Sequence, residues 1–165
     1  MNRTTIIHAD VMLAYCAGVV DSDGTIGIKR NSYAARVVKD CTQATYSARI
    51  CVRQVQPEGV AVLREAFGGS IRTNKGVGRG RDLFSWEVTD RLAESALRLL
   101  LPYLRIKRAQ AENCIALREV IARSKAARVA VGRGHAGAAH RPIELTNQME
   151  ALKVRASELN RVGIR

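Results

Sequence analysis

The clearest pattern in the sequence is an alternation of polar and apolar residues in two stretches. After Gly24, the apolar residues Ile26 and Ile28 alternate with polar or small ones. In the stretch TYSARICVRQ, the apolar members are Tyr46, Ala48, Ile50 and Val52. A period of two is typical of a strand with one buried face. The opposite face of these two predicted strands would carry Thr25, Gly27, Lys29, Asn31, Tyr33, Thr45, Ser47, Arg49, Cys51 and Arg53.

A helix and a hairpin follow the first pair of strands. The segment 57–67 begins with a proline and is followed by two glycines, which predicts a helix with these limits. The stretch SIRTNKGVGRGRDLFSWEV then predicts a hairpin with a tip rich in glycine and arginine. On its second arm, Phe84, Trp86 and Val88 share one face.

Helix signals account for the rest of the chain. Asp10 is placed to cap a helix over about 11–20, and Asp90 to cap one that Pro102 stops. We expect a long basic helix over about 104–128, a loop over about 130–141 and a last helix over about 143–160. The apolar stripe of this last helix consists of Leu145, Met149, Leu152, Ala156 and Leu159.

The order of these elements is helix, two strands, helix, two strands and then helices. Strands with one polar face suit a mostly antiparallel sheet covered by helices on one side only, so we expect the α+β class. A chain of 165 residues can bury the core of one domain. We expect a single domain over 1–165, with its core at about 8–128 and a C-terminal loop and helix at about 129–165.

The charge balance suggests a polyanionic partner. Lys and Arg number 27 against 15 Asp and Glu, which gives a net charge of +12 and a pI near 10.3. Cations that neutralise phosphates release condensed counterions, so this excess favours nucleic acid. A merely basic surface is the alternative. No apolar run approaches the roughly 20 residues that span a bilayer, so we expect no membrane association.

The N-terminus and the cysteines indicate the compartment. His8 and Asp10 stand where a signal peptide needs its apolar core, so we do not expect secretion. The four cysteines are scattered without a C-x-x-C pair, which favours reduced thiols over disulfides or zinc. We therefore expect an intracellular protein located with DNA, in a bacterial or phage-infected cytoplasm or in an organelle.

The polar face of the predicted sheet carries side chains of the types that read base edges in the major groove, where a β-ribbon can fit. Arg79 and Arg81, at the hairpin tip, would contact backbone phosphates. An ordinary solvated face is the alternative, but the net charge favours nucleic acid. The predicted DNA contacts are Thr25, Lys29, Asn31, Tyr33, Ser47, Arg49, Arg53, Arg72, Asn74, Arg79 and Arg81.

One side of the first helix is lined by small residues. Positions three or four residues apart share a helix face, and small side chains there permit close approach of another helix. A second copy of the same helix would fit, which predicts a dimer interface, whereas a crowded core within one chain is the alternative. The predicted interface consists of Ala14, Ala17, Gly18 and Asp21.

Asp23 follows the period of the strand and heads the row of groups predicted to meet DNA. A carboxylate beside phosphate is unfavourable unless a divalent cation lies between them. Two paired copies would bring two Asp23 carboxylates together, as two-metal hydrolysis requires. The stretch DSDG is equally suited to an Asx turn between helix and strand, so both interpretations remain open on these residues alone.

With its surroundings, the stretch Cys16–Gly24, CAGVVDSDG, resembles the signature motif of the LAGLIDADG homing endonucleases. The stretches FGGSIR and LPYLRIKRAQA are also similar to that family. The resemblance implies an αββαββα unit whose saddle-shaped antiparallel sheet lies along the major groove, with motif helices at the dimer core. A chain with one motif resembles the homodimeric class, which cleaves near-palindromic DNA. We expect an intron-encoded or free-standing gene.

The resemblance implies roles for individual residues. Asp23 would bind Mg²⁺, for which Mn²⁺ or Ca²⁺ can substitute in binding, and the Ser22 carbonyl would be a further ligand. Lys107, within LRIKR, would stabilise charge in the transition state. Asp21, the first acid of the motif, would stabilise the junction at the helix end rather than bind metal.

The position of the family's catalytic glutamine remains open. It falls on Gln54, but strand parity puts Gln54 with the apolar set, so Arg53 and Gln56 are alternatives. The predicted function is a magnesium-dependent, homodimeric endonuclease that hydrolyses both strands of a long near-palindromic DNA site. The alternative is an RNA-splicing maturase or a non-cleaving DNA-binding regulator on the same fold.

Overall fold

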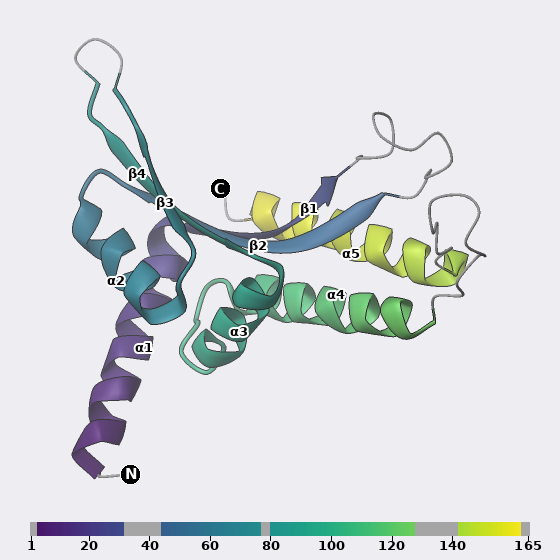
Figure 1. Cartoon of the computed structure of the whole chain (residues 1–165), viewed down its shortest axis with the longest axis horizontal. Helices are drawn as coiled ribbons and strands as arrows, with labels where there is room; N and C mark the ends of the chain where they lie inside the picture. The colour runs from purple at the N-terminus through teal and green to yellow at the C-terminus, as the bar shows by residue number, and fades with distance from the viewer. Residues whose placement is uncertain (1–2, 32–43, 77–79, 128–141, 163–165) are drawn as a thin grey trace, which may run out of the picture.

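The computed structural model describes residues 3–31, 44–76, 80–127 and 142–162. Within them lie five helices and four strands, in an order that agrees with the sequence prediction (Figure 1). Their bounds are α1 Arg3–Asp23, β1 Gly24–Asn31, β2 Thr45–Gln54, α2 Pro57–Phe67, β3 Ser70–Asn74, β4 Leu83–Thr89, α3 Asp90–Leu100, α4 Arg108–Ala126 and α5 Ile143–Val162.

The strands form one antiparallel sheet in the order β1-β2-β4-β3. Ile26 lies opposite Ile50, which lies opposite Val88, and all three side chains are buried. Their neighbours Thr25 and Cys51 are paired on the other face. The predicted alternation is therefore confirmed in these strands, and the chain belongs to the α+β class.

The inner face of the sheet is covered by helices and holds the hydrophobic core. Helices α3 and α4 pack against β2, and both lie on one side of the sheet, with α5 beside α4 (Figure 1). Trp86, Ile50 and Leu117 are fully buried, and each such side chain stabilises the fold by about 1.5–3 kcal/mol. The indole N–H of Trp86 donates to the Gly68 carbonyl at 2.8 Å, which satisfies its polar atom.

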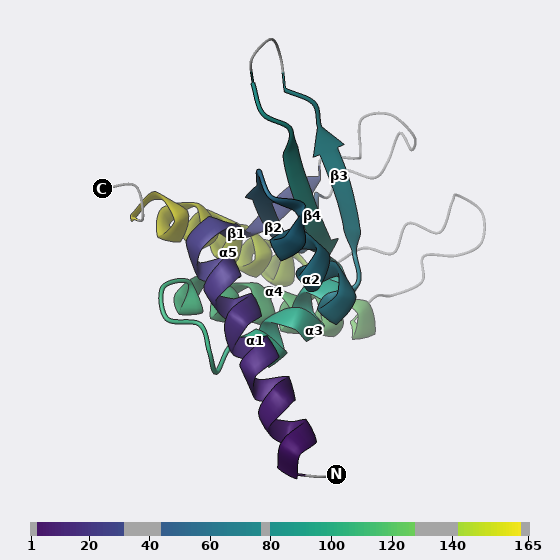
Figure 2. The same ribbon diagram turned by 90° about the vertical axis from the view of Figure 1, so that its left-hand side faces the viewer.

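Helix α1 packs against the rest of the chain mainly through its C-terminal half. Cys16, Ala17 and Val20 are fully buried there. The first turns project away from the sheet (Figure 2). Val11 and Tyr15 are 63% and 51% exposed. The helix therefore presents apolar side chains on the surface of a single chain.

Neither aspartate predicted to cap a helix does so. Helix α1 begins well before Asp10, whose carboxylate accepts the Tyr103 hydroxyl at 2.7 Å instead of capping a helix. Asp90 is the first residue of α3, and Thr89 holds the N-cap position. The Asp90 carboxylate accepts a hydrogen bond from Arg118 at 3.3 Å, because this guanidinium, only 10% exposed, needs a counter-charge.

The helix predicted over about 104–128 starts later than expected, at Arg108. The backbone N–H groups of residues 105–107 donate to the carboxylate of Asp21, at the end of α1. They are held in a turn by this distant partner. A long-range contact therefore determines where α4 begins, and local helix propensity does not reveal it.

Helix α5 covers the outer edge of β1. It agrees with the helix predicted over about 143–160, and its stripe residues Met149 and Ala156 are buried. The side-chain amide of Asn160 donates to the Ile26 carbonyl at 3.0 Å and so occupies a group that an edge strand leaves unpaired. Across the described ranges, none of the helices has the length and hydropathy needed to cross a membrane.

Candidate active site and nucleic-acid interface

The outer face of the sheet brings together most of the side chains predicted to contact DNA. Strand register places Arg53 of β2 and Arg72 of β3 on either side of β4, facing the same way. Arg81 is exposed near the hairpin tip, whereas Tyr33 and Arg79 lie outside the described residues. The predicted residues on this face are Thr25, Lys29, Asn31, Ser47, Arg49, Arg53, Arg72 and Asn74, of which Ser47 is buried.

Positive charge on the outer face is largely uncompensated. Arg49 is neutralised by Glu87 of β4, with 2.5 Å between the guanidinium and carboxylate. Among the residues that the structure describes, Lys29, Arg53 and Arg72 take part in no ion pair. Unpaired cations on one face create the potential that attracts a polyanion.

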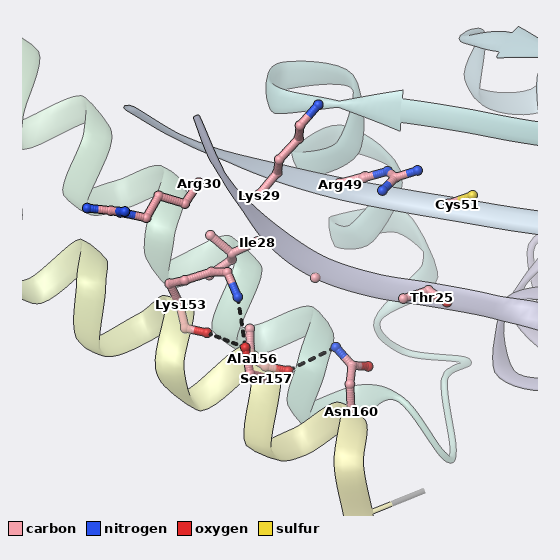
Figure 3. A pocket seen from close by; sticks show the side chains of 11 residues that line it. Thr25, Ile28, Lys29, Arg30, Arg49, Cys51, Lys153, Ala156, Ser157 and Asn160 are labelled. Atoms are coloured by element: carbon pink, nitrogen blue, oxygen red, sulfur yellow. Dashed lines mark hydrogen bonds between the residues drawn. The ribbon is translucent and has the colours of Figure 1, made fainter. Parts of the chain in front are cut away.

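A pocket separates this face from α5 at the edge of β1 (Figure 3). Its polar lining consists of Thr25, Lys29, Arg30, Arg49 and Cys51 from the sheet and Lys153, Ser157 and Asn160 from α5. The Lys153 ammonium donates to the Ser157 hydroxyl at 2.8 Å. Sequence reasoning missed the α5 residues, because no local pattern indicates that this helix borders the first strand.

The two aspartates of the motif have opposite environments. Asp21 is buried, and its carboxylate accepts the backbone N–H groups of residues 105–107 at 2.7, 3.2 and 2.9 Å. Asp23 is exposed at the last position of α1 and accepts the side-chain amide of Gln54 at 2.8 Å. Asp21 thus has the contacts of a structural residue, and Asp23 those of a group available to a ligand.

Gln54 is the residue, among the three considered for the family's glutamine, that contacts Asp23. Strand parity directs Gln54 to the inner side of the sheet, which suggested burial in the core. Val52, however, pairs with Gly24, the first residue of β1. Beyond Val52 the inner side therefore meets the end of α1 instead of the core.

Lys107 contacts the end of α1 from the turn before α4. Its Nζ donates to the carbonyls of Val20 at 2.9 Å, of Asp21, and of Ser22 at 3.4 Å. These carbonyls are the last of the helix and carry the negative end of its dipole. Burial lowers the pKa of Lys107, and the nearby carboxylates of Asp21 and Asp23 oppose this shift only in part. The Ser22 carbonyl, a predicted metal ligand, is thus shared with an ammonium group.

Asp23 and Gln54 open into a hollow formed by α1, β2 and α2. Its other lining residues are Tyr15, Arg53, Val55, Gln56, Glu58, Gly59 and Leu83. In the described part of the chain, no group of three or more His, Cys, Asp or Glu is placed to hold a metal ion. One exposed carboxylate nevertheless fits Mg²⁺, which commonly shares its coordination between one or two carboxylates, phosphate and water. The Asp23 carboxylate therefore has the chemistry of one ligand for such a cation.

The small-residue seam predicted on α1 is divided between two faces. Ala17 is fully buried, and the Asp21 carboxylate accepts hydrogen bonds from the backbone of its own chain, so both residues are already covered within one chain. Ala14 and Gly18 are exposed, and a Cβ at Gly18 would meet open space. Together with Val11, they form an exposed strip at helical spacing on the other face of α1.

Solved structures with the same architecture decide the fold. The homing endonuclease I-CvuI in complex with the I-CreI target is matched with a TM-score of 0.70 and 21% identity, over 93% of this chain and 84% of that one. The archaeal intron-encoded homing endonuclease I-Vdi141I, complexed with DNA, is matched with a TM-score of 0.66 and 12% identity, over 91% and 84%. The I-SmaMI LAGLIDADG homing endonuclease bound to cleaved DNA is matched with a TM-score of 0.55 and 17% identity, over 86% and 42%. The chain has the LAGLIDADG homing endonuclease fold.

No protein-family model and no curated protein sequence matches the chain, so its likeness to homing endonucleases lies in the fold. It agrees with the resemblance seen in the stretch CAGVVDSDG. In the fold, this stretch forms the last turns of α1, and Asp23 stands where the helix passes into β1. The end of the motif helix is therefore the place where the basic sheet face and an exposed carboxylate meet.

Proposed function

We propose that the protein is a site-specific double-strand DNA endonuclease that acts as a homodimer with a divalent metal ion. A fold alone does not fix a function, so the proposal rests on the site. The observation that carries it is the exposed Asp23 carboxylate at the head of a basic sheet face. Solved structures of the same fold, those of I-CvuI and I-Vdi141I, are complexes with DNA.

The outer face supplies the groups needed to bind duplex DNA. Lys29, Arg53 and Arg72 are exposed cations that can contact phosphates. The amides of Asn31 and Asn74 can donate to and accept from base edges in the major groove. Binding should therefore weaken steeply as salt concentration rises, because phosphate contacts release counterions.

The end of α1 supplies the groups needed for hydrolysis. Asp23 and the Ser22 carbonyl would hold Mg²⁺, with Mn²⁺ or Ca²⁺ as substitutes in binding. When bound, such a cation neutralises charge on the scissile phosphate and activates water. Gln54 holds one oxygen of the Asp23 carboxylate and so orients it. Lys107 keeps a positive charge beside this site, which favours negative charge developing in the transition state.

Two copies of the chain would complete the enzyme. One chain contributes one exposed motif carboxylate, whereas cutting both strands requires a site for each. The match to I-SmaMI covers only 42% of that longer chain, as expected if this chain corresponds to one half of it. We assign the dimer contact to the exposed strip of Val11, Ala14 and Gly18. Two-fold symmetry then predicts a target with pseudo-palindromic halves.

Selection of cleaved sites from a randomised DNA library with Mg²⁺ tests the proposal and identifies a target. On that target, Asp23→Asn should cut at least about 100-fold more slowly, because a metal-binding charge is lost. It should still bind the target in Ca²⁺ through the basic face. Glu65→Gln, an exposed carboxylate change on α2 outside the hollow, is the matched control and should cut at the wild-type rate.

The other outcomes identify the alternatives. Equal cleavage by Asp23→Asn and the wild type would remove the metal role of this residue. A wild-type protein that binds DNA and never cuts it would be a non-cleaving regulator. A protein that instead accelerates splicing of an intron RNA would be a maturase.

A further inference from the structure

We propose that Gly59 is a positioning residue that lets the amide of Gln54 reach Asp23; this inference rests on the proposed function. Gly59 lies in the first turn of α2, is buried, and lines the hollow into which Asp23 opens. The side chain of Gln54 lies directly against it. A glycine here leaves room that any other residue would fill.

The distances show how tight this contact is. A Cβ built on Gly59 would lie 2.2 Å from Oε1, 3.1 Å from Cδ and 3.3 Å from Nε2 of Gln54. The first distance is far below van der Waals contact, so a side chain at position 59 must displace the amide. The same amide donates to the Asp23 carboxylate at 2.8 Å. A displacement of Oε1 also moves Nε2, because both atoms belong to one rigid amide, so the hydrogen bond to Asp23 loses its geometry.

Backbone conformation does not explain the glycine. Among the described glycines, only Gly68 and Gly69 have positive φ, so the backbone at Gly59 is one that alanine adopts readily. Glycine is also a poor helix former, and α2 would be more stable with alanine in its first turn. When a residue beside a candidate site disfavours the secondary structure in which it lies, we expect it to have a role in that site.

Other glycines near the site are crowded by different atoms or by none. A Cβ on Gly24 would collide with the backbone of Val20 in α1, with 2.4 Å to its carbonyl oxygen, so Gly24 serves the fold. A Cβ on Gly18 would meet open space. At Gly59, all three nearest atoms belong to Gln54, so the consequence of a substitution falls on that side chain.

Gly59→Ala should therefore separate stability from activity. The crowded atoms are the far end of a side chain that can rotate toward solvent, so the fold should persist. Alanine favours the helix, and the melting temperature should stay equal or rise. The Asp23 carboxylate should lose its partner, and single-turnover cleavage should fall by about tenfold to 100-fold, as for other groups that orient a metal ligand. DNA affinity in Ca²⁺ should not change.

A double-mutant cycle shows whether Gly59 acts through Gln54. In a Gln54→Ala background, Gly59→Ala should cause no further loss of cleavage, because the displaced amide is already absent. Ala61→Gly changes one methyl group on the exposed side of the same helix and is the matched control. It should lower the melting temperature slightly and leave the cleavage rate unchanged. Independent losses that multiply in the double variant, or wild-type cleavage by Gly59→Ala, would overturn the proposal.

The amide itself provides a readout that does not depend on cleavage. In the wild-type protein, the ¹H–¹⁵N resonances of the Gln54 side chain should shift when Asp23 is changed to Asn. In a Gly59→Ala background, the same change should leave them in place, and a crystal structure should show the hydrogen bond broken. A Gln54 amide still bonded to Asp23 in Gly59→Ala would refute the positioning role, even if the wild-type protein cuts no DNA.

Discussion

Asp21 and Asp23 are close neighbours at the end of α1, but the two sides of this helix end use a carboxylate in opposite ways. On the inner side, which we call the junction, Asp21 is buried against the backbone of residues 105–107. On the outer side, Asp23 faces the hollow, and among the described residues its side-chain hydrogen-bond partner is Gln54.

The difference shows what makes a carboxylate available for chemistry. A carboxylate has about four acceptor positions, and hydrogen bonds to a charged group contribute about 1.5–3 kcal/mol each. Asp21 uses its oxygens to connect α1 to the segment before α4. Asp23 has acceptor positions left for a cation or water. The same residue type therefore serves stability where backbone donors surround it and is suited to catalysis where they do not.

Replacing Asp21 should have the largest effect on stability. Asp21→Asn removes the charge and turns an amide N–H toward backbone donors, so the free energy of unfolding should fall by about 3 kcal/mol or more. Asp23→Asn should change it by less than about 0.5 kcal/mol, because that side chain is exposed. Urea denaturation of both variants measures the contrast. Equal losses would show that the two sides of the helix end do not differ in this way.

The second-largest effect is expected for a charge placed on the exposed strip of α1, which should weaken the proposed dimer. Gly18→Glu has room for its side chain within one chain, so the monomer should stay folded. Two such charges facing each other cost several kcal/mol, so the dimer dissociation constant should rise at least about 100-fold. Analytical ultracentrifugation measures it. Ala61→Glu, on the exposed side of α2, is the control, and an unchanged constant in Gly18→Glu would place the interface elsewhere.

Lys107 lies between the two sides of the helix end, and replacing it should have an intermediate effect on stability. Lys107→Met keeps the length of the side chain but leaves the carbonyls at the end of α1 without their ammonium. Unfolding free energy should fall by about 1–2 kcal/mol, and single-turnover cleavage should also fall. Arg105→Met removes an exposed charge from the same turn and keeps the backbone bond to Asp21. If both variants lose the same stability, the loss comes from net charge and not from the carbonyl contacts.

Replacing Glu94 should have the smallest effect on stability, and this effect should depend on pH. Partial burial alone would raise the pKa of Glu94, but hydrogen bonds from Arg98 and Arg118 outweigh it and hold the pKa below its ordinary value of 4.5. The unfolded chain therefore binds this proton more readily, so the stabilisation is complete above that value and is lost as the pH falls through the folded-state pKa. Glu94→Gln should cost about 1 kcal/mol at neutral pH, and the difference should vanish as the pH falls below the folded-state pKa of Glu94. Denaturation at several pH values checks this, and a constant difference would assign the effect to packing.

Features that depend on neighbouring residues were predictable from the sequence. The alternation around Ile26 and Ile50 fixed both strand faces, and register puts Arg53 and Arg72 on the predicted side. The motif stretch located the exposed carboxylate of Asp23. These signals are local, because a strand alternates and a motif is contiguous.

Features that depend on distant contacts were not predictable. The start of α4 is set by Asp21, which is more than eighty residues away in the sequence. Gln54 lies on the inner side of the sheet as parity predicts, but it contacts Asp23 instead of the core because of where α1 ends. Lys153 reaches the sheet only because α5 returns to β1. Propensity and period carry no information about such partners, so they predicted the elements better than the site.

The hydrogen bond from Asn160 to the Ile26 carbonyl has a consequence for crowded solutions. An uncovered edge strand can form hydrogen bonds with a strand of another molecule, and repeated pairing of this kind produces open-ended aggregates. Helix α5 packs along β1, and Asn160 occupies one of the backbone carbonyls of this edge strand. The helix should therefore protect the protein against aggregation at high concentration.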